Sequence, residues 1–461
     1  MTERAKFSGR IGFILAAAGS AVGLGNIWRF PYLAGKNGGA SFLVIYLFFI
    51  FFICFPIMAA EIAIGRKAGL NAYGSYKKIG GGSWGSVGIL GILIGILVLS
   101  FYNVVAGWAF GYFIEIVFGD LLSVKDFGTH FSQYVADPSD NLFFSLGFMI
   151  LTALIVSQGI QKGIEVANKI MMPGLYILLI ALIVYSLTLP GAMKGVEFYL
   201  VPDLSEITRH TFLDGVRQAF FSLSLGMGAL LTYGSYLHKD QNIVSSAAII
   251  TIADTMVAFL AGLMVFPLVF SAGQSPAEGP PLVFMILPKI FQDMGPILGR
   301  VVGGSFFLML CFAALTSTIS MLEVPTAYLV DEKKLPRKKT VWTLATVVFI
   351  MGLPSLLSQG TQGFEMLNKL SFYHGHDFMT FISDLADMGL TLSGFLLCIF
   401  VTYRWKLFNM HEELAIGSPG YMSSGLHHFI NISLRFISPI AMGILFTMLM
   451  LEKFFGLDNI F

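Results

Sequence analysis

The sequence is poor in charged residues. Only 12% of its 461 residues are Asp, Glu, Lys or Arg, whereas soluble domains contain about 25%. The 28 basic and 27 acidic residues nearly cancel and leave a net charge of +1, so the chain lacks the basic excess that nucleic-acid-binding proteins use. The low charge content argues against a soluble domain, and we expect no nucleic-acid partner.

Cysteine is scarce as well. The chain has three, Cys54, Cys311 and Cys398, and each lies in an apolar run far from the other two. This spacing argues against a disulfide framework and against a cysteine-based metal site, so we interpret them as reduced packing residues. We expect no cleavable signal peptide, because the apolar run that starts at Ile11 is too long for the core of one.

The sequence is rich in long hydrophobic runs. Hydrophobic residues make up 56% of the chain, and the mean hydropathy is +0.78. Runs of about 20 apolar residues, which are long enough to cross a bilayer, recur from end to end, and this pattern predicts an all-α polytopic membrane protein. We place eleven spans at residues 11–36, 40–65, 87–118, 143–160, 166–189, 212–237, 242–270, 297–330, 340–357, 378–403 and 427–452.

The distribution of Lys and Arg predicts the orientation of these spans. If the N-terminus is cytoplasmic, 18 of the 28 basic residues fall on the cytoplasmic side and nine on the outer side, while Arg29 lies within the first span. Cytoplasmic loops carry the excess of basic residues in membrane proteins. With an odd number of spans, the C-terminus is then outside.

The first span is interrupted near its middle. Gly19, Gly23 and Gly25 weaken the helix, and Asn26 and Arg29 place polar groups at bilayer depth. The pair Gly19 and Gly23 alone would fit close helix packing, but packing accounts for neither Asn26 nor a second interruption. A dinucleotide-binding loop would need a strand before the glycines, and none is predicted.

The second interruption lies in the sixth span, where Gly226 and Gly228 follow Ser222 and Ser224. Paired interruptions in corresponding spans are typical of transporters built from two inverted repeats, with the binding site at the midplane. Freed backbone groups at such breaks need a polar occupant. We therefore predict an inverted 5+5 core in one transporter domain, with a first repeat over about 11–190, a second over about 212–404 and an extra helix over about 427–452.

Two external loops and one histidine pair leave more than one interpretation open. The loops Gly119–Asn141 and Ser271–Pro296 are long enough to be functional, and we expect either lids or plain connectors. The stretch HGHD, from His374 to Asp377, contains two histidines without a third placed ligand. Two histidines alone are weak evidence for a metal site, so we expect a solvated loop there.

Five motifs resemble those of the neurotransmitter:sodium symporter family, in its bacterial, leucine-transporter-like amino-acid branch. In order they are GSAVGLGNIWRFPY (19–32), PIMAAEIAIGR (56–66), SLSLGMG (222–228), TYGSYL (232–237) and ALTSTIS (314–320). The likeness extends from Arg4 to about Asp331 and is loose beyond Pro336. It implies a sodium-coupled amino-acid importer in the plasma membrane, that of a bacterium, and not an enzyme. A sodium-dependent sensor or a channel of the same fold are the alternatives, and nothing in the sequence specifies an oligomeric state.

The resemblance implies two sodium ions. One family site uses carbonyls of the first and eighth helices with two adjacent hydroxyls, and the matching positions are Gly19, Val22, Ala313, Thr316 and Ser317. Residues 313, 316 and 317 share one helical face, although such hydroxyls can also bond back to their own helix. The other site corresponds to Ala21, Asn26, Ser222 and Asp254 and is completed by the carboxylate of the substrate.

The resemblance also implies the substrate site. Its positions are Ala21, Leu24, Gly25, Val98, Tyr102, Phe221, Ser224, Met227, Ser317 and Met321. The substrate carboxylate would meet the N–H groups near Leu24 and Gly25 and the hydroxyl of Tyr102. The side-chain pocket is apolar, and its two methionines make it adaptable, so we favour a hydrophobic or aromatic L-amino acid such as tryptophan, tyrosine or leucine.

Gating residues follow from the same resemblance. On the outside we expect Arg29 to pair with Asp384, with Asp387 as the alternative. On the inside we expect Arg4 to pair with Asp331, with Tyr236 and Glu323 nearby. Glu61 lies within the second span, where a carboxylate is costly and usually functional, and we assign it to support of the broken backbone of spans one and six.

Chloride dependence is the last expectation. The family's chloride shell corresponds here to Tyr46, Gln218, Ser222, Asp254 and Ala258. Asp254 stands where chloride-dependent members have asparagine, and Ala258 where they have serine. An ionised carboxylate would supply the negative charge that a buried sodium needs, so we favour the ionised form and expect that chloride is not required. A protonated Asp254 that acts as an asparagine mimic is the alternative.

Overall fold

The computed structural model describes residues 5–276 and 282–456, and every regular element in these ranges is a helix. Nine helices in this part are long and apolar enough to cross a membrane, and a bent pair forms one more span. Together with a broken sixth span, they give the eleven predicted. The continuous spans are α3–η2–α4 (Ala40–Ala68), α6 (Gly85–Phe118), α8 (Pro138–Ser157), η5–α9 (Ile160–Leu187), α13 (Ile243–Ser271), α15 (Pro296–Lys333), α16 (Arg337–Leu357), α18–η8–α19 (Phe378–Ala415) and α20–η10–α21 (Gly425–Phe455).

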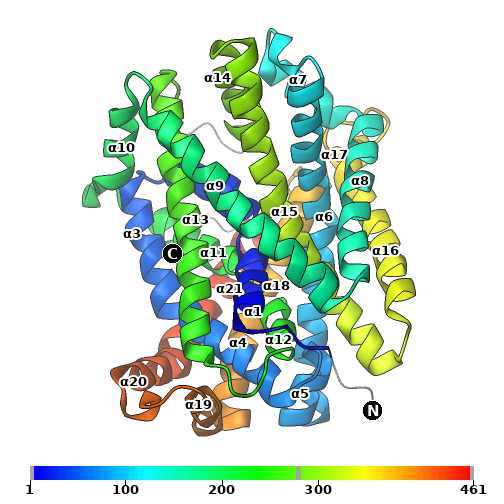
Figure 1. Cartoon of the computed structure of the whole chain (residues 1–461), viewed down its shortest axis with the longest axis vertical. Coiled ribbons are helices and arrows are strands. Elements are labelled where there is room, and N and C mark those ends of the chain that lie inside the picture. Colours follow the sequence, from blue (N-terminus) through cyan, green and yellow to red (C-terminus); the bar gives the residue numbers. More distant parts are fainter. Residues whose placement is uncertain (1–4, 277–281, 457–461) are drawn as a thin grey trace.

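Short helices connect these spans at the two ends of the bundle. They are α5 (Ala72–Gly80), η3 (Gly82–Trp84), η4 (Leu121–Ser123), α7 (Phe127–Ala136), α10 (Ala192–Leu200), η6 (Leu204–Glu206), η7 (Leu282–Ile286), α14 (Leu287–Asp293), α17 (Glu365–Asn368) and η9 (Tyr421–Ser423). In Figure 1, α7 and α14 lie at one end, and α5 and α19 lie at the other. Following the predicted orientation, we call these the outer and the inner end.

The first span consists of two helical segments that meet at an angle. The inner segment, α1 (Arg10–Ala21), ends where Val22 adopts an extended conformation. The outer segment begins with the π-helical turn η1 (Gly25–Arg29) and continues as α2 (Phe30–Lys36), and it is inclined by 50° to α1. The predicted interruption is therefore present, in the middle of the bundle.

The sixth span is interrupted over six residues. Its outer segment α11 (Arg209–Ser222) and its inner segment α12 (Ala229–Gly234) are separated by residues 223–228. Within the break, Ser224, Gly226 and Gly228 have φ angles of 52°, 84° and 76°. Glycine adopts this left-handed region without steric cost, which explains why two of the three are glycines.

The inner segment of the sixth span packs backbone to backbone against the second. A Cβ atom on Gly234 would lie 2.6 Å from the carbonyl oxygen of Ile62, and one on Gly65 would overlap the carbonyl oxygen of Leu231. Because both positions are glycine, α12 and α4 approach more closely than side chains would allow.

The two external loops fold as helices over the outer end. The first contains α7, and the described part of the second contains η7 and α14. Phe131 of α7 and Phe284 of η7 stack with ring centroids 5.2 Å apart, and Phe284 also contacts Trp28 and Trp108. The loops therefore pack against the outer halves of the first and third spans.

Candidate functional site

Both broken spans border one small cavity in the middle of the bundle. Its volume is about 10 Å³, room for about one water molecule. Nine of the ten predicted substrate residues line it, and Leu24 does not. The lining is Ala21, Gly23, Gly25, Val98, Tyr102, Phe221, Ser222, Ser224, Met227, Ser317 and Met321.

Gly23 is the lining residue that sequence reasoning missed. A Cβ atom there would lie 2.6 Å from Ser317 Oγ and 2.7 Å from the hydroxyl oxygen of Tyr102. The hydroxyl of Tyr102 in turn accepts a hydrogen bond of 2.9 Å from the backbone N–H of Leu24. Tyr102 therefore contacts the broken backbone of the first span directly, and only glycine at position 23 leaves room for it.

Three of the four residues predicted for the first sodium site form a buried cluster. The side-chain amide of Asn26 donates to Ser222 Oγ (2.9 Å) and to Asp254 Oδ1 (2.8 Å), and Ser222 Oγ donates to Asp254 Oδ2 (2.8 Å). Ala21 lines the cavity beside them. Side chains of three different spans thus meet beside the cavity. Ser222 and Asp254 contribute oxygens, whereas Asn26 turns its NH2 group toward them and its Oδ1 toward the N–H of Gly23.

The surroundings of Asp254 suit a carboxylate. Both of its oxygens accept hydrogen bonds, and an ionised carboxylate is an acceptor only. The predicted chloride-shell residue Tyr46 donates to Ser222 Oγ (3.3 Å), and Gln218 donates to the carbonyl of Gly25 (2.8 Å). No basic side chain among the described residues pairs with Asp254, so an ionised Asp254 would need a cation from outside the chain.

The residues predicted for the second sodium site also come together. Ser317 Oγ lies 3.0 Å and Thr316 Oγ1 3.4 Å from the carbonyl oxygen of Val22. A Cβ atom on Gly19 would lie 3.1 Å from Thr316 Cβ. Thr316 also bonds back to the carbonyl of Ala313 (3.0 Å), so the two interpretations of this hydroxyl coexist. The break of the first span thus faces two hydroxyls of α15.

Glu61 contacts the break of the sixth span. Its Oε1 accepts a hydrogen bond of 2.9 Å from the backbone N–H of Gly226, while Oε2 bonds to no described residue. The side chain is 2% exposed. The expected support of the sixth span is present, and no bond from Glu61 to the first span occurs among the described residues.

At the outer end, the structure corrects the predicted partner of Arg29. Its guanidinium pairs with Asp387 Oδ2 at 3.0 Å, not with Asp384. Asp384 is engaged elsewhere, because its Oδ2 accepts a hydrogen bond of 2.8 Å from Tyr373 and lies 3.8 Å from the ammonium of Lys453. The guanidinium of Arg29 also lies 4.6 Å from the ring centroid of Phe221.

A wider cavity of about 380 Å³ lies on the outer side of this ion pair, and we call it the vestibule. Its lining includes Arg29, Asp387, Trp108 and Leu24. Tyr102 and Phe221 line both the vestibule and the small cavity. The two aromatic side chains therefore lie between the small cavity and the vestibule.

At the inner end, Glu323 is the centre of a buried polar cluster. Tyr236 donates to its Oε1 at 2.7 Å, and Arg337 pairs with its Oε2 at 2.5 Å. Sequence reasoning placed Tyr236 beside Glu323 but treated Arg337 only as a cytoplasmic charge. The predicted partner Arg4 lies outside the described residues. Asp331 accepts a hydrogen bond of 3.3 Å from Asn71.

Comparison with known proteins gives a consistent result. The model of the "Sodium:neurotransmitter symporter family" matches residues 4–136 and 129–455. An uncharacterised sodium-dependent transporter of Bacillus subtilis, YhdH, is 40% identical over 448 residues, covering 96% of each chain. The sodium-dependent serotonin transporter of Drosophila melanogaster is 28% identical over 492 residues, covering 95% of this chain and 76% of the relative.

A solved structure has the same architecture. That of MhsT in complex with L-phenylalanine superposes with a TM-score of 0.88 at 44% identity, covering 96% of this chain and 99% of MhsT. The all-α fold with two broken helices is thus confirmed. The chain belongs to the sodium:neurotransmitter symporter family, as a multi-pass, sodium-dependent membrane symporter and not an enzyme.

Proposed function

We propose that the protein imports a hydrophobic or aromatic L-amino acid together with sodium by alternating access. The observation that carries this proposal is the composition of the small cavity. Its described lining contains no charged side chain and is formed largely by Val98, Tyr102, Phe221, Met227 and Met321. An apolar lining favours an apolar substrate side chain, while the backbone groups freed at the two breaks are suited to an α-carboxylate and an α-ammonium.

The likeness to MhsT supports an aromatic substrate. The MhsT structure contains L-phenylalanine, and this chain is 44% identical to it over nearly its whole length. The thioethers of Met227 and Met321 adapt to ring shape and make favourable contacts with aromatic rings. L-Phenylalanine and L-tryptophan are therefore the first substrates to test.

We assign two sodium ions to the two oxygen clusters. The cluster of Asn26, Ser222 and Asp254 lies beside the cavity, so the substrate carboxylate would complete its sodium shell. Sodium and substrate would then raise each other's affinity by the same factor. The cluster of Val22, Thr316 and Ser317 joins the broken first span to α15, so sodium there would hold the two together.

Chloride is not required in this proposal. A sodium ion with a zwitterionic substrate leaves one positive charge in a buried site, and Asp254 supplies the compensating negative charge. The expected orientation is a cytoplasmic N-terminus and an external C-terminus, in the plasma membrane of a bacterium.

The test is uptake of labelled L-phenylalanine and L-tryptophan into proteoliposomes under an inward sodium gradient. We expect saturable accumulation against the substrate gradient, loss of uptake when choline replaces sodium, and competition by other apolar amino acids. Sodium-dependent binding without accumulation would indicate the sensor, and uptake that never exceeds equilibrium would indicate the channel. Competition by charged amino acids alone would contradict the substrate class.

Gluconate in place of chloride tests the assignment of Asp254. Wild-type uptake should persist, whereas Asp254→Asn should lose uptake or become chloride-dependent, and the second outcome should be clearest with Ala258→Ser added. Wild-type uptake that collapses without chloride would contradict the assignment. Ser246→Ala is a suitable control, because Ser246 lies on the same helix but bonds to Asn242 and Arg10 at its inner end.

A further inference from the structure

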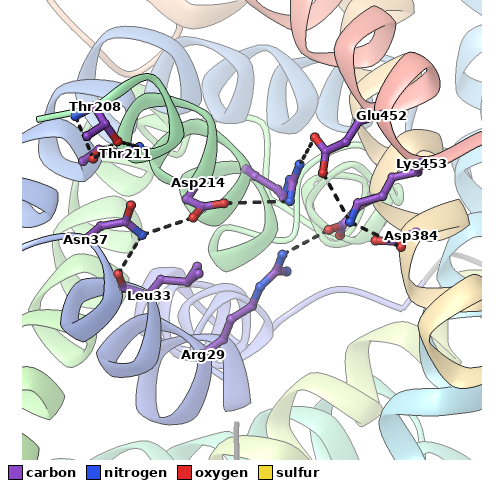
Figure 2. Close-up of polar contacts among 11 residues, drawn as sticks. Arg29, Leu33, Asn37, Thr208, Thr211, Asp214, Asp384, Glu452 and Lys453 are labelled. Atoms are coloured by element: carbon purple, nitrogen blue, oxygen red, sulfur yellow. Dashed lines mark hydrogen bonds and ion pairs between the residues drawn. The ribbon is translucent and has the colours of Figure 1, made fainter. Parts of the chain in front are cut away.

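A chain of charged residues runs along the outer end of the molecule beside the Arg29–Asp387 pair. It consists of Asp214, Arg217, Glu452, Lys453 and Asp384, and we call it the rim chain. Figure 2 shows these contacts together with the side chains of Arg29 and Asn37. Neither the family motifs nor the predicted gates include its central members, Glu452 and Lys453.

The distances along the rim chain are those of ion pairs. The guanidinium of Arg217 lies 3.8 Å from Asp214 Oδ1 and 3.7 Å from Glu452 Oε2. The ammonium of Lys453 lies 3.3 Å from Glu452 Oε1 and 3.8 Å from Asp384 Oδ2. The far end continues into the first span, because the side-chain amide of Asn37 donates to Asp214 Oδ2 at 3.1 Å.

These residues belong to four different spans. Asn37 ends the outer segment of the first span, Asp214 and Arg217 lie on the outer segment of the sixth, Asp384 lies on the tenth, and Glu452 and Lys453 end the eleventh. The eleventh span packs along the tenth. The tenth span also packs against the sixth, for example Gly394 against Phe220. Among the described residues, Arg217–Glu452 is the ion pair that joins the tenth and eleventh spans to the sixth.

The rim chain also separates two cavities. Arg217 and Asp384 line the vestibule, whereas Glu452 and Lys453 line a second outer cavity of about 500 Å³. The side chains of the rim chain are 14% to 34% exposed. Ion pairs with this exposure are individually weak and reversible, which suits contacts that must break in every transport cycle.

Lys453 has a further effect on the tenth span. It lies beside Asp384, and Tyr373 donates to the same carboxylate. Burial raises the pKa of Tyr373, so its hydroxyl stays protonated and remains a donor. Asp384 is thereby kept from competing with Asp387, three residues further on, for Arg29.

We propose that Glu452 and Lys453, at the end of the eleventh span, are positioning residues of the outer gate. Glu452 holds the outer segment of the sixth span through Arg217, and Lys453 holds the tenth span through Asp384. The closed outer end is then held by two parallel ion contacts, Arg29–Asp387 and Arg217–Glu452. This proposal rests on the proposed alternating access, and it assigns to the eleventh span a part in gating outside the ten-helix core.

The test measures access to the vestibule and needs no amino-acid substrate. Val105, which lines the vestibule, is replaced by Cys, and a second reporter, Ser20→Cys, lies at the inner segment of the first span. Cys54, Cys311 and Cys398 are first replaced, and labelling by a maleimide is followed in choline with purified protein. Failure to transport an amino acid would therefore leave this readout unaffected.

We expect Glu452→Gln to label about two- to fivefold faster at Val105→Cys and more slowly at Ser20→Cys. Arg217→Gln should have the same effect, and the double variant should label no faster than the faster single variant. Lys453→Gln should also speed labelling, whereas Lys453→Arg, which keeps the charge, should not. Asp293→Asn, which neutralises an exposed outer acid paired with Lys289, is the control and should label like the wild type.

A wild-type labelling rate in Glu452→Gln would overturn the proposal. A double variant whose increase in labelling rate equals the product of the two single increases would overturn it as well. Faster labelling of both reporters would overturn it as well, because it would indicate a loosened fold and not a shift between outward-open and closed states.

Discussion

The outer and inner ends of the substrate pathway are closed by carboxylates in different surroundings. At the outer end, Asp387 accepts one hydrogen bond from Arg29, and its Oδ1 bonds to no described residue. At the inner end, both oxygens of Glu323 are bonded, Oε1 to Tyr236 (2.7 Å) and Arg337 (3.1 Å), and Oε2 to Arg337 (2.5 Å).

Burial of the charged groups is similar at the two ends. The carboxylates of Glu323 and Asp387 are 0% and 5% exposed, and the guanidiniums of Arg337 and Arg29 are 24% and 23% exposed. The contrast lies in bonding, because Glu323 accepts hydrogen bonds from two side chains and Asp387 from one, and Asp387 borders the vestibule. From this difference in hydrogen bonding we infer that the protein opens outward more easily than inward when no substrate is bound.

The largest change in labelling rate should come from Arg337→Met at the inner end. The substitution leaves the carboxylate of Glu323 buried without its cation, and breaking a buried pair in this way costs about 3–5 kcal/mol. A hydrogen bond from Tyr236 and entering water offset part of this free energy. We therefore expect the labelling rate at Ser20→Cys to rise by about tenfold or more.

Lys338→Met is the matched control for this variant, because Lys338 is the next residue on the same helix and is exposed. An unchanged rate in Arg337→Met would show that the inner end is held closed by other contacts. Glu323→Gln combined with Arg337→Met should restore slow labelling, since a neutral amide needs no cation.

A smaller effect is expected at the outer end, and it distinguishes the two acids of the tenth span. Asp387→Asn removes the charge that Arg29 contacts, and labelling at Val105→Cys should rise by about fivefold. Asp384→Asn should raise it less, because Asp384 acts on the gate only through Lys453. If Asp384→Asn had the larger effect, the pairing of Arg29 would change partners during transport.

The smallest change in labelling rate should come from raising the salt concentration. Raising choline chloride from about 0.1 M to 1 M shortens the Debye length from about 10 Å to 3 Å. This should weaken the rim-chain pairs, whose acids Glu452 and Asp384 are 34% and 14% exposed, more than the pair of the fully buried Glu323. We expect labelling at Val105→Cys to rise by up to about twofold while labelling at Ser20→Cys stays constant. Equal responses at the two reporters would contradict the difference in burial.

Much of the fold could be predicted from the sequence, because the bilayer imposes a length and a polarity on every span. The two interruptions could be identified because close helix packing explains the glycines but neither Asn26 nor a second break in a corresponding span. The exact ends of spans depend on local bonds that hydropathy does not register. The fourth span begins at Pro138, five residues before the predicted start, because Asp137 caps it by accepting from the N–H of Ser139.

The ion pairs were the least predictable part of the site. Asp384 and Asp387 lie nearly one turn apart on the same helix, so the sequence offers two partners for Arg29, and the expected one, Asp384, was wrong. In the structure Asp384 is engaged by Tyr373 and by Lys453, and Lys453 is distant in the sequence. Arg337 and Glu323 face each other across a turn between two helices, and the charge count that identifies cytoplasmic loops does not reveal such a contact.

The glycine contacts between α4 and α12 bear on how helix movements during transport can be measured. Because Gly65 and Gly234 bring the two backbones into direct contact, we expect the second span and the inner segment of the sixth to move as one body, with the joint in residues 223–228. A pair of spin labels on these two helices should then keep one separation in every state, and it would serve as an internal reference for measuring how far all other helices move.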